Sequence, residues 1–178
     1  MGQRFPSRLA RPFPMEGLMA AATFRRFTMV GVFLVVFGIQ PRAQNNDPVV
    51  GTWVLNVAKS KFSPGPAPKS ESRTYAMAGN EIKATSTGVD ADGKATSAAW
   101  TVVYDSKERP VTGDPDADTL SLKRVDPNTT EFTEKKGGKV VLTGTRTVSK
   151  DGKTLTITTK GTNAKGQKVD NVVVYDKK

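Results

Sequence analysis

Three arginines in the second part of the chain stand in extended stretches in which alternate residues are apolar. They are Arg73, Arg124 and Arg146, three of only four arginines after residue 43, a region that contains 17 lysines. Alternate residues of a β-strand point to the same face, so each guanidinium is expected on the apolar face of its strand. A buried guanidinium needs a partner, and a carboxylate, sulfate or phosphate of a ligand would bind it through two parallel hydrogen bonds.

Three aromatic residues share this inward parity: Trp100, Tyr104 and Tyr175. Together with the three arginines they form the predicted ligand-binding set. Two alternatives stay open. Aromatic side chains at such positions also serve as core residues. Arg73 or Arg124 would reach solvent if a β-bulge reversed the parity or if the residue lay at a strand end.

The chain contains no histidine and no cysteine, which excludes several kinds of chemistry. Ser–His and Cys–His catalytic pairs, zinc sites with the usual ligands, and disulfides are all ruled out. The acids at 114, 116 and 118 are spaced like the start of a calcium loop, but Thr119 occupies its glycine position and Val125 that of its bidentate glutamate. The sequence therefore predicts no metal site and no cofactor.

Acid–base catalysis by two carboxylates is the enzymatic mechanism that remains. Most of the acids lie in turns, where solvent keeps a carboxylate unperturbed. Glu131 and Glu134 lie in a strand but at opposite parity, so they would point to opposite faces. We therefore expect a protein that is not an enzyme.

The elements that would position these residues are short antiparallel strands. Tight hairpin turns are marked by glycine or asparagine, which tolerate positive φ, at 92–93, 126–128, 137–138 and 151–152. The nine predicted strands span 51–57, 71–77, 81–88, 95–105, 119–125, 129–134, 140–149, 154–160 and 168–176. An open sheet of this size would leave two long unpaired edges. The sequence therefore favours an all-β fold, an antiparallel up-and-down meander closed into a small β-barrel of about eight to ten strands.

The composition of residues 44–178 suggests a hollow barrel. This region has 19 Thr and 16 Val but only seven aromatic residues, which suits pleated strands and fills a barrel thinly. The alternative is a slim barrel filled by Leu, Val and Met. Prolines in the connection 58–70 exclude a helix in its second half, so Phe62 is expected over one end of the barrel or in a surface loop.

Residues 1–43 differ in kind from the rest and predict a targeting segment. Arg25-Arg26 provides a basic front, followed by a mostly apolar stretch at 27–39, the length of a signal-peptide core and shorter than a membrane-spanning helix. Cleavage after Ala43 would leave one domain, residues 44–178. We expect a periplasmic or secreted protein; the alternative is an uncleaved leader that anchors the domain to the inner membrane.

The charge of the predicted mature domain is modest. Residues 44–178 hold 21 of the 27 Lys and Arg and 16 of the 17 Asp and Glu, a net charge of +5. Nucleic-acid binding would need clustered basic residues with aromatics among them, so no nucleic-acid partner is expected. The basic hairpin 135–139 would be a solvated tip or would make weak contact with an anionic envelope surface. We expect a monomer.

Both ends of the domain carry motifs of a known kind of barrel. Gly51-x-Trp53 resembles the lipocalin signature, and Gly51-Thr52-Trp53-x-Leu55 followed by Lys61-Phe62 resembles the start of the fatty-acid-binding proteins. The segment 151–155 and the final Tyr175-Asp176-Lys177 are similar to the last two strands of the latter family. The opening at 51–62 also resembles that of an exported bacterial group with no known activity.

The resemblance implies a lipocalin-like, or calycin, barrel with two departures from the fatty-acid-binding proteins. Val173 stands where those proteins have the arginine that holds the ligand carboxylate, and 58–70 cannot form their two-helix lid. In lipocalins a late arginine packs across the first-strand tryptophan, so the resemblance implies that Arg146 lies over Trp53 and closes the barrel.

These observations predict an exported, non-enzymatic carrier that binds a small hydrophobic or amphipathic, possibly anionic ligand inside the barrel. Arg124, Arg146 and Tyr175 would be its polar anchors, and Trp100, Tyr104 and Arg73 would line the same space. The alternative is a structural or surface-interaction protein of the cell envelope, built on a filled barrel.

Overall fold

The computed structural model describes residues 47–178, which form strands and one short 3-10 helix. The strands are β1 (Gly51–Leu55), β2 (Ser70–Ala78), β3 (Glu81–Val89), β4 (Ala95–Val102), β5 (Arg109–Thr112), β6 (Thr119–Arg124), β7 (Thr129–Lys136), β8 (Lys139–Val148), β9 (Thr154–Thr162) and β10 (Lys168–Lys177). The helix, η1, is Val57–Lys59. No helix among the described residues is long and apolar enough to cross a membrane. The predicted leader, residues 1–43, lies outside the described part of the chain.

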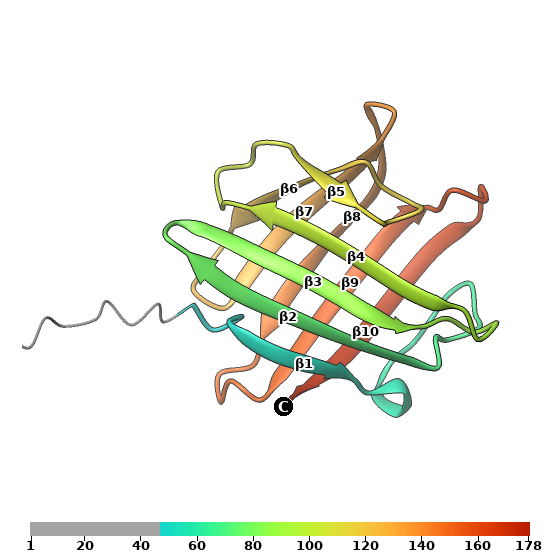
Figure 1. Ribbon diagram of the computed structural model, residues 1–178, viewed down its shortest axis with the longest axis horizontal. Helices are drawn as coiled ribbons and strands as arrows, with labels where there is room; N and C mark the ends of the chain where they lie inside the picture. Colours follow the sequence, from blue (N-terminus) through green and yellow to red (C-terminus); the bar gives the residue numbers. More distant parts are fainter. Residues whose placement is uncertain (1–46) are drawn as a thin grey trace, which may run out of the picture. The chain divides into compact units, whose positions relative to one another are not determined.

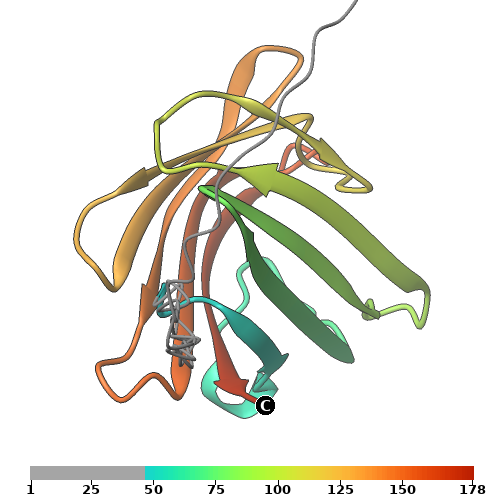
Figure 2. The ribbon, with the colours of Figure 1, turned by 60° about the vertical axis from the view of Figure 1, so that its left-hand side comes forward.

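The strands form one closed antiparallel barrel. Each strand pairs with the next along the chain, and β10 pairs with β1 to complete the ring. Figures 1 and 2 show the strands curling around a common interior, with β1 beside β10. The all-β, up-and-down barrel predicted from the turn signals is confirmed.

The structure adds one strand that the sequence did not predict. No strand is among the nine predicted ones between residues 105 and 119, but β5 lies there and joins β4 to β6. Only two residue pairs connect β5 to β4 and two connect it to β6. Four residues that include Pro110 give too short an alternation to be recognised in a sequence, and proline is tolerated here because the pairing is so brief.

Alternation along the strands separates an apolar interior from a threonine-rich exterior. In β9, Leu155 and Ile157 are buried and alternate with threonines that lie nearer the surface. Threonines of neighbouring strands meet on the outside, as in the 2.7 Å contact between the hydroxyls of Thr145 and Thr158. Such cross-strand pairs stabilise a sheet and account for the abundance of threonine.

One end of the barrel is closed by the segment before β1, and we call it the closed end. Trp53 is fully buried and donates from Nε1 to the carbonyl of Val49 at 2.7 Å. The cation over the Trp53 ring is Lys177 Nζ, 4.9 Å from its centroid. Arg146, which the lipocalin resemblance placed over Trp53, lies instead over Tyr75 at 5.0 Å. Lys177 takes this place because β10 pairs it directly with Trp53.

Gly144 allows an aromatic ring to lie against β8 inside the barrel. It pairs with Phe132 of β7, and a Cβ at position 144 would lie 2.5 Å from the Phe132 ring and 1.9 Å from the carbonyl oxygen of Thr158. No side chain fits without movement of the backbone.

We expect Gly144→Ala to lower the free energy of unfolding by about 2 kcal/mol, because overpacking forces backbone shifts. Urea unfolding followed by tryptophan fluorescence measures this change. Gly65→Ala is the control, since nothing lies within 4 Å of a Cβ there. Equal stabilities of the two variants would contradict the close packing of the Phe132 ring against Gly144.

Candidate ligand-binding site

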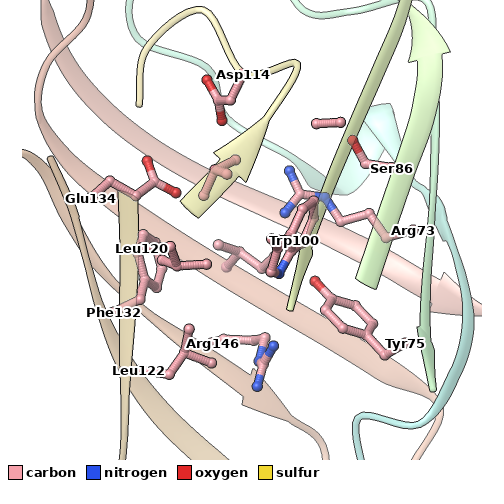
Figure 3. Close-up of a pocket in the computed structure, with 13 residues that line it drawn as sticks. Arg73, Tyr75, Ser86, Trp100, Asp114, Leu120, Leu122, Phe132, Glu134 and Arg146 are labelled. Carbon is pink, nitrogen blue, oxygen red and sulfur yellow. The ribbon is translucent and has the colours of Figure 1, made fainter. Parts of the chain in front are cut away.

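The barrel encloses a cavity of about 90 Å³. Its wall has an apolar part and a polar part, and Figure 3 shows the side chains of both converging on one space. A space of this size has room for several water molecules or for part of a small organic molecule. The barrel is therefore hollow.

Most of the apolar part of the wall comes from inward positions of four strands. These side chains are Trp100 of β4, Leu120 and Leu122 of β6, Phe132 of β7 and Ile157 of β9. Each follows the alternation of its own strand, which is why the sequence pattern places them together. They offer a ligand a surface that favours hydrocarbon or an aromatic ring.

Arg146 of β8 provides a buried positive charge in the cavity wall. The residue is 6% exposed, and its Nη2 donates to the Tyr104 hydroxyl at 3.1 Å. Its guanidinium also lies over the ring of Tyr75. No carboxylate among residues 47–178 forms a salt bridge with it. A buried guanidinium in this state attracts an anion or another strong hydrogen-bond acceptor.

Arg124 and Tyr104 belong to the closed end and are already engaged. Asp47 accepts hydrogen bonds from Arg124 Nη2 and from the Tyr104 hydroxyl, the latter at 2.7 Å. Arg124 also stacks on the Tyr104 ring at 3.8 Å. Burial and the hydrogen bond to Asp47 raise the pKa of Tyr104, although Arg146 opposes the shift. The tyrosine stays neutral and links Asp47 to Arg146.

Arg73 and Tyr175 share a single carboxylate, that of Glu71. Arg73 Nε donates to Glu71 Oε1 at 2.7 Å, and the Tyr175 hydroxyl donates to Oε2 at the same distance. The guanidinium of Arg73 lies between two rings, 5.3 Å from that of Tyr175 and 5.9 Å from that of Trp100. Burial raises the pKa of Tyr175. The positive charge of Arg73 opposes this shift, and the negative charge of Glu71 adds to it.

Two carboxyl groups in the cavity wall were missed as site residues: Glu134 and Asp114. Glu134 has the inward parity of Phe132 on β7, and its strand partners are Leu120 and Leu142. That parity was visible in the sequence. Asp114 lies in the β5–β6 connection, where no periodicity predicts its direction.

Burial raises the pKa of both carboxyls, and Asp114 adds to the shift of Glu134. Burial and then the neighbouring Asp114 raise the pKa of Glu134 to about 7, against the opposing effect of Arg73. Burial also raises the pKa of Asp114. No hydrogen bond or salt bridge within residues 47–178 involves the Glu134 side chain. Its carboxyl is available to a ligand.

The cavity continues into a wider hollow of about 560 Å³ at the opposite end of the barrel, which we call the mouth. The two spaces share Arg73, Asp114, Phe132, Glu134 and Ile157. Phe62 lines the mouth, at one of the two places expected for it. Asp116 Oδ1 accepts a hydrogen bond from Ala164 N at 2.8 Å and so ties the β5–β6 connection to the β9–β10 turn.

The six predicted ligand-binding residues thus fall into three places. Arg73, Trp100 and Arg146 line the cavity, and Tyr175 lines the mouth. Arg124 and Tyr104 lie at the closed end, because their partner Asp47 comes from a segment that the strand pattern does not cover. Among the described residues, no three potential metal ligands gather at one point.

No protein-family model matches this sequence, and no curated protein matches it either. Among solved structures, Rv2717c from M. tuberculosis is similar over 78% of this chain and 98% of its own, with 14% identity and a TM-score of 0.50. The zebrafish ileal bile acid-binding protein complexed with cholic acid is similar over 74% of this chain and 99% of its own, with 12% identity and a TM-score of 0.42. A redesigned β-barrel is similar over 74% of this chain and 92% of its own, with 13% identity and a TM-score of 0.43.

The comparison with the M. tuberculosis protein concerns the fold alone. It agrees with the ring of strands from β1 to β10. The chain has a lipocalin-like barrel fold, as the motifs at its two ends predicted.

We expect stability to depend on pH through Glu134. Folding raises the pKa of this carboxyl from 4.5 to about 7. The contribution of this carboxyl to the free energy of unfolding is therefore complete below pH 4.5 and is lost as the pH rises through about 7. The free energy of unfolding should fall over this range by about 2 kcal/mol more in the wild type than in Glu134→Gln.

Urea unfolding at a series of pH values measures this difference. Glu131→Gln is the matched control, because Glu131 lies on the same strand with its side chain 54% exposed, beside Lys123. It should keep the slope of the wild type. Parallel curves for the wild type and Glu134→Gln would show that the Glu134 carboxyl is solvated.

Proposed function

We propose that this protein is a non-enzymatic carrier that binds a small amphipathic molecule inside its barrel. The observation that carries the proposal is Arg146, a cation that is 6% exposed, faces a cavity and has no carboxylate partner among the described residues. An anionic group of a ligand supplies that partner. The apolar body of the ligand then lies against Trp100, Leu122 and Phe132.

The balance of forces favours such a ligand. Burying hydrocarbon against the apolar wall contributes about 25 cal/mol for each Å² removed from water. A charge-assisted hydrogen bond to a desolvated guanidinium contributes about 1.5–3 kcal/mol and fixes the orientation of the ligand. Arg146 is well suited to this role because Tyr75 and Tyr104 already hold its guanidinium in place.

This assignment changes the polar anchors expected from the sequence. Arg124 is engaged by Asp47 and Tyr175 by Glu71, so neither is available to a ligand without losing its present partner. Arg146 remains as the anchor. The envelope-surface alternative requires a filled barrel, and the cavity of about 90 Å³ favours the carrier.

We further propose that the carrier is exported and acts as a monomer in the periplasm or outside the cell. The basic and apolar pattern of residues 1–43 supports export through the general secretory route. The mass of the protein isolated from its own host tests this proposal. A species that spans residues 44–178 is expected, and retention of the leader would favour the anchored alternative.

Arg146→Met should weaken the binding of octanoate at least tenfold, because it removes the charged partner of the carboxylate and keeps an unbranched side chain at this position. Titration followed by the fluorescence of Trp100, which lines the cavity, measures the affinity. Arg109→Met is the control, since Arg109 forms a surface ion pair with Asp105 and does not line the cavity. Equal weakening in both variants would refute the role given to Arg146.

A further inference from the structure

The mouth of the barrel is acidic although the domain as a whole is basic. Two bases line it, Arg73 and Lys165, against six acids: Glu71, Asp90, Asp92, Asp114, Asp116 and Glu134. Residues 44–178 carry a net charge of +5, so this local excess of acids opposes the overall balance. A concave surface lined by one sign of charge concentrates ligands of the opposite sign.

Some of these acids have partners within the protein. Glu71 binds Arg73 and Tyr175. Asp90 and Asp116 accept hydrogen bonds from backbone amides of Lys94 and Ala164. These three acids support the loops of the mouth.

Glu134 and Asp114 are different because both also line the inner cavity. Figure 3 shows their carboxyl groups near each other on one side of that space, with Arg146 at its other end. Asp114 Oδ1 accepts a hydrogen bond from the Asp116 amide at 2.8 Å. Glu134 lies between the inward positions of Leu120 and Leu142. Placing the charge of Glu134 in this largely buried position beside Asp114 is costly to the protein. A cation between the two carboxyls would remove that cost.

The cavity therefore has a negative end and a positive end. Arg146 pairs with Thr130, which is four residues from Glu134 on β7, a separation of about 13 Å along the strand. Apolar side chains of β6 and β9 lie along the space between them. This separation suits a chain of about eight carbons with a charged group at each end.

We propose that the ligand is zwitterionic, with a primary amine held by Glu134 and Asp114 at the mouth and an anionic group held by Arg146 at the inner end. This inference rests on the proposed carrier function and specifies the chemical class of its ligand. The acidic mouth selects the orientation, since it attracts the amine and repels a carboxylate. Arg73 is bonded to Glu71 through Nε and forms no salt bridge with Glu134 or Asp114, although its positive charge acts on both carboxyls.

Three probes of equal chain length test the proposal with the purified full chain: ω-aminooctanoate, octanoate and octylamine. Isothermal titration calorimetry should show that ω-aminooctanoate binds at least tenfold more tightly than either of the others, because each of them leaves one end of the cavity unpaired. Glu134→Gln and Asp114→Asn should each abolish most of this advantage. Both should leave octanoate binding unchanged or a few-fold tighter.

Glu131→Gln removes a carboxylate from the outer face of the same strand and should leave all three affinities unchanged. Binding of octanoate with no gain from the amine would overturn the zwitterion while leaving the carrier function intact. Tighter binding of octylamine than of ω-aminooctanoate would overturn the role of Arg146 as well. No binding of any probe would overturn both proposals.

Discussion

The pairing of β1 with β10 is the constraint on which the interior of this protein depends. Three residue pairs join the two strands, and the segment after β1 extends the join through hydrogen bonds from Asn56 N to Val174 O and from Lys61 N to Val172 O. This closure separates the inner faces of the strands from the solvent around the barrel. The energetic significance of Arg146 and Glu134 follows from it, because the same side chains on an open sheet would be solvated and unremarkable.

Alternation within strands made much of the site predictable. The parity that placed Arg146 and Trp100 inside was correct, since both lie in long regular strands whose neighbours fix the register. The same rule applies to Glu134, whose inward direction follows from Phe132. Glu131 and Glu134 lie on opposite faces of their strand, which speaks against a catalytic pair but leaves Glu134 as a single inward acid, and for this reason it was not predicted as a site residue.

Partners that are distant in sequence explain what was not predictable. Asp47 is 77 residues from Arg124, and Glu71 is 104 residues from Tyr175. Period-two reasoning gives the face of a side chain but not the residue it meets across the barrel. The expected contact between Arg146 and Trp53 failed for a related reason, since the register of β1 with β10 brings Lys177 to that ring. Loop residues such as Asp114 carry no periodic signal at all.

The short β5 makes the strength of the barrel wall uneven. Nine residue pairs join β9 to β10 and nine join β2 to β3, whereas β5 is joined to each neighbour by two. Local opening costs least where the fewest hydrogen bonds and apolar contacts must be broken. The backbone amides of β5 should therefore exchange with solvent faster than those of any other strand in the described part of the chain. Trp100 and Val111 pair across this seam and also line the cavity, so transient separation of β4 and β5 would give the interior a side entrance, independent of the mouth.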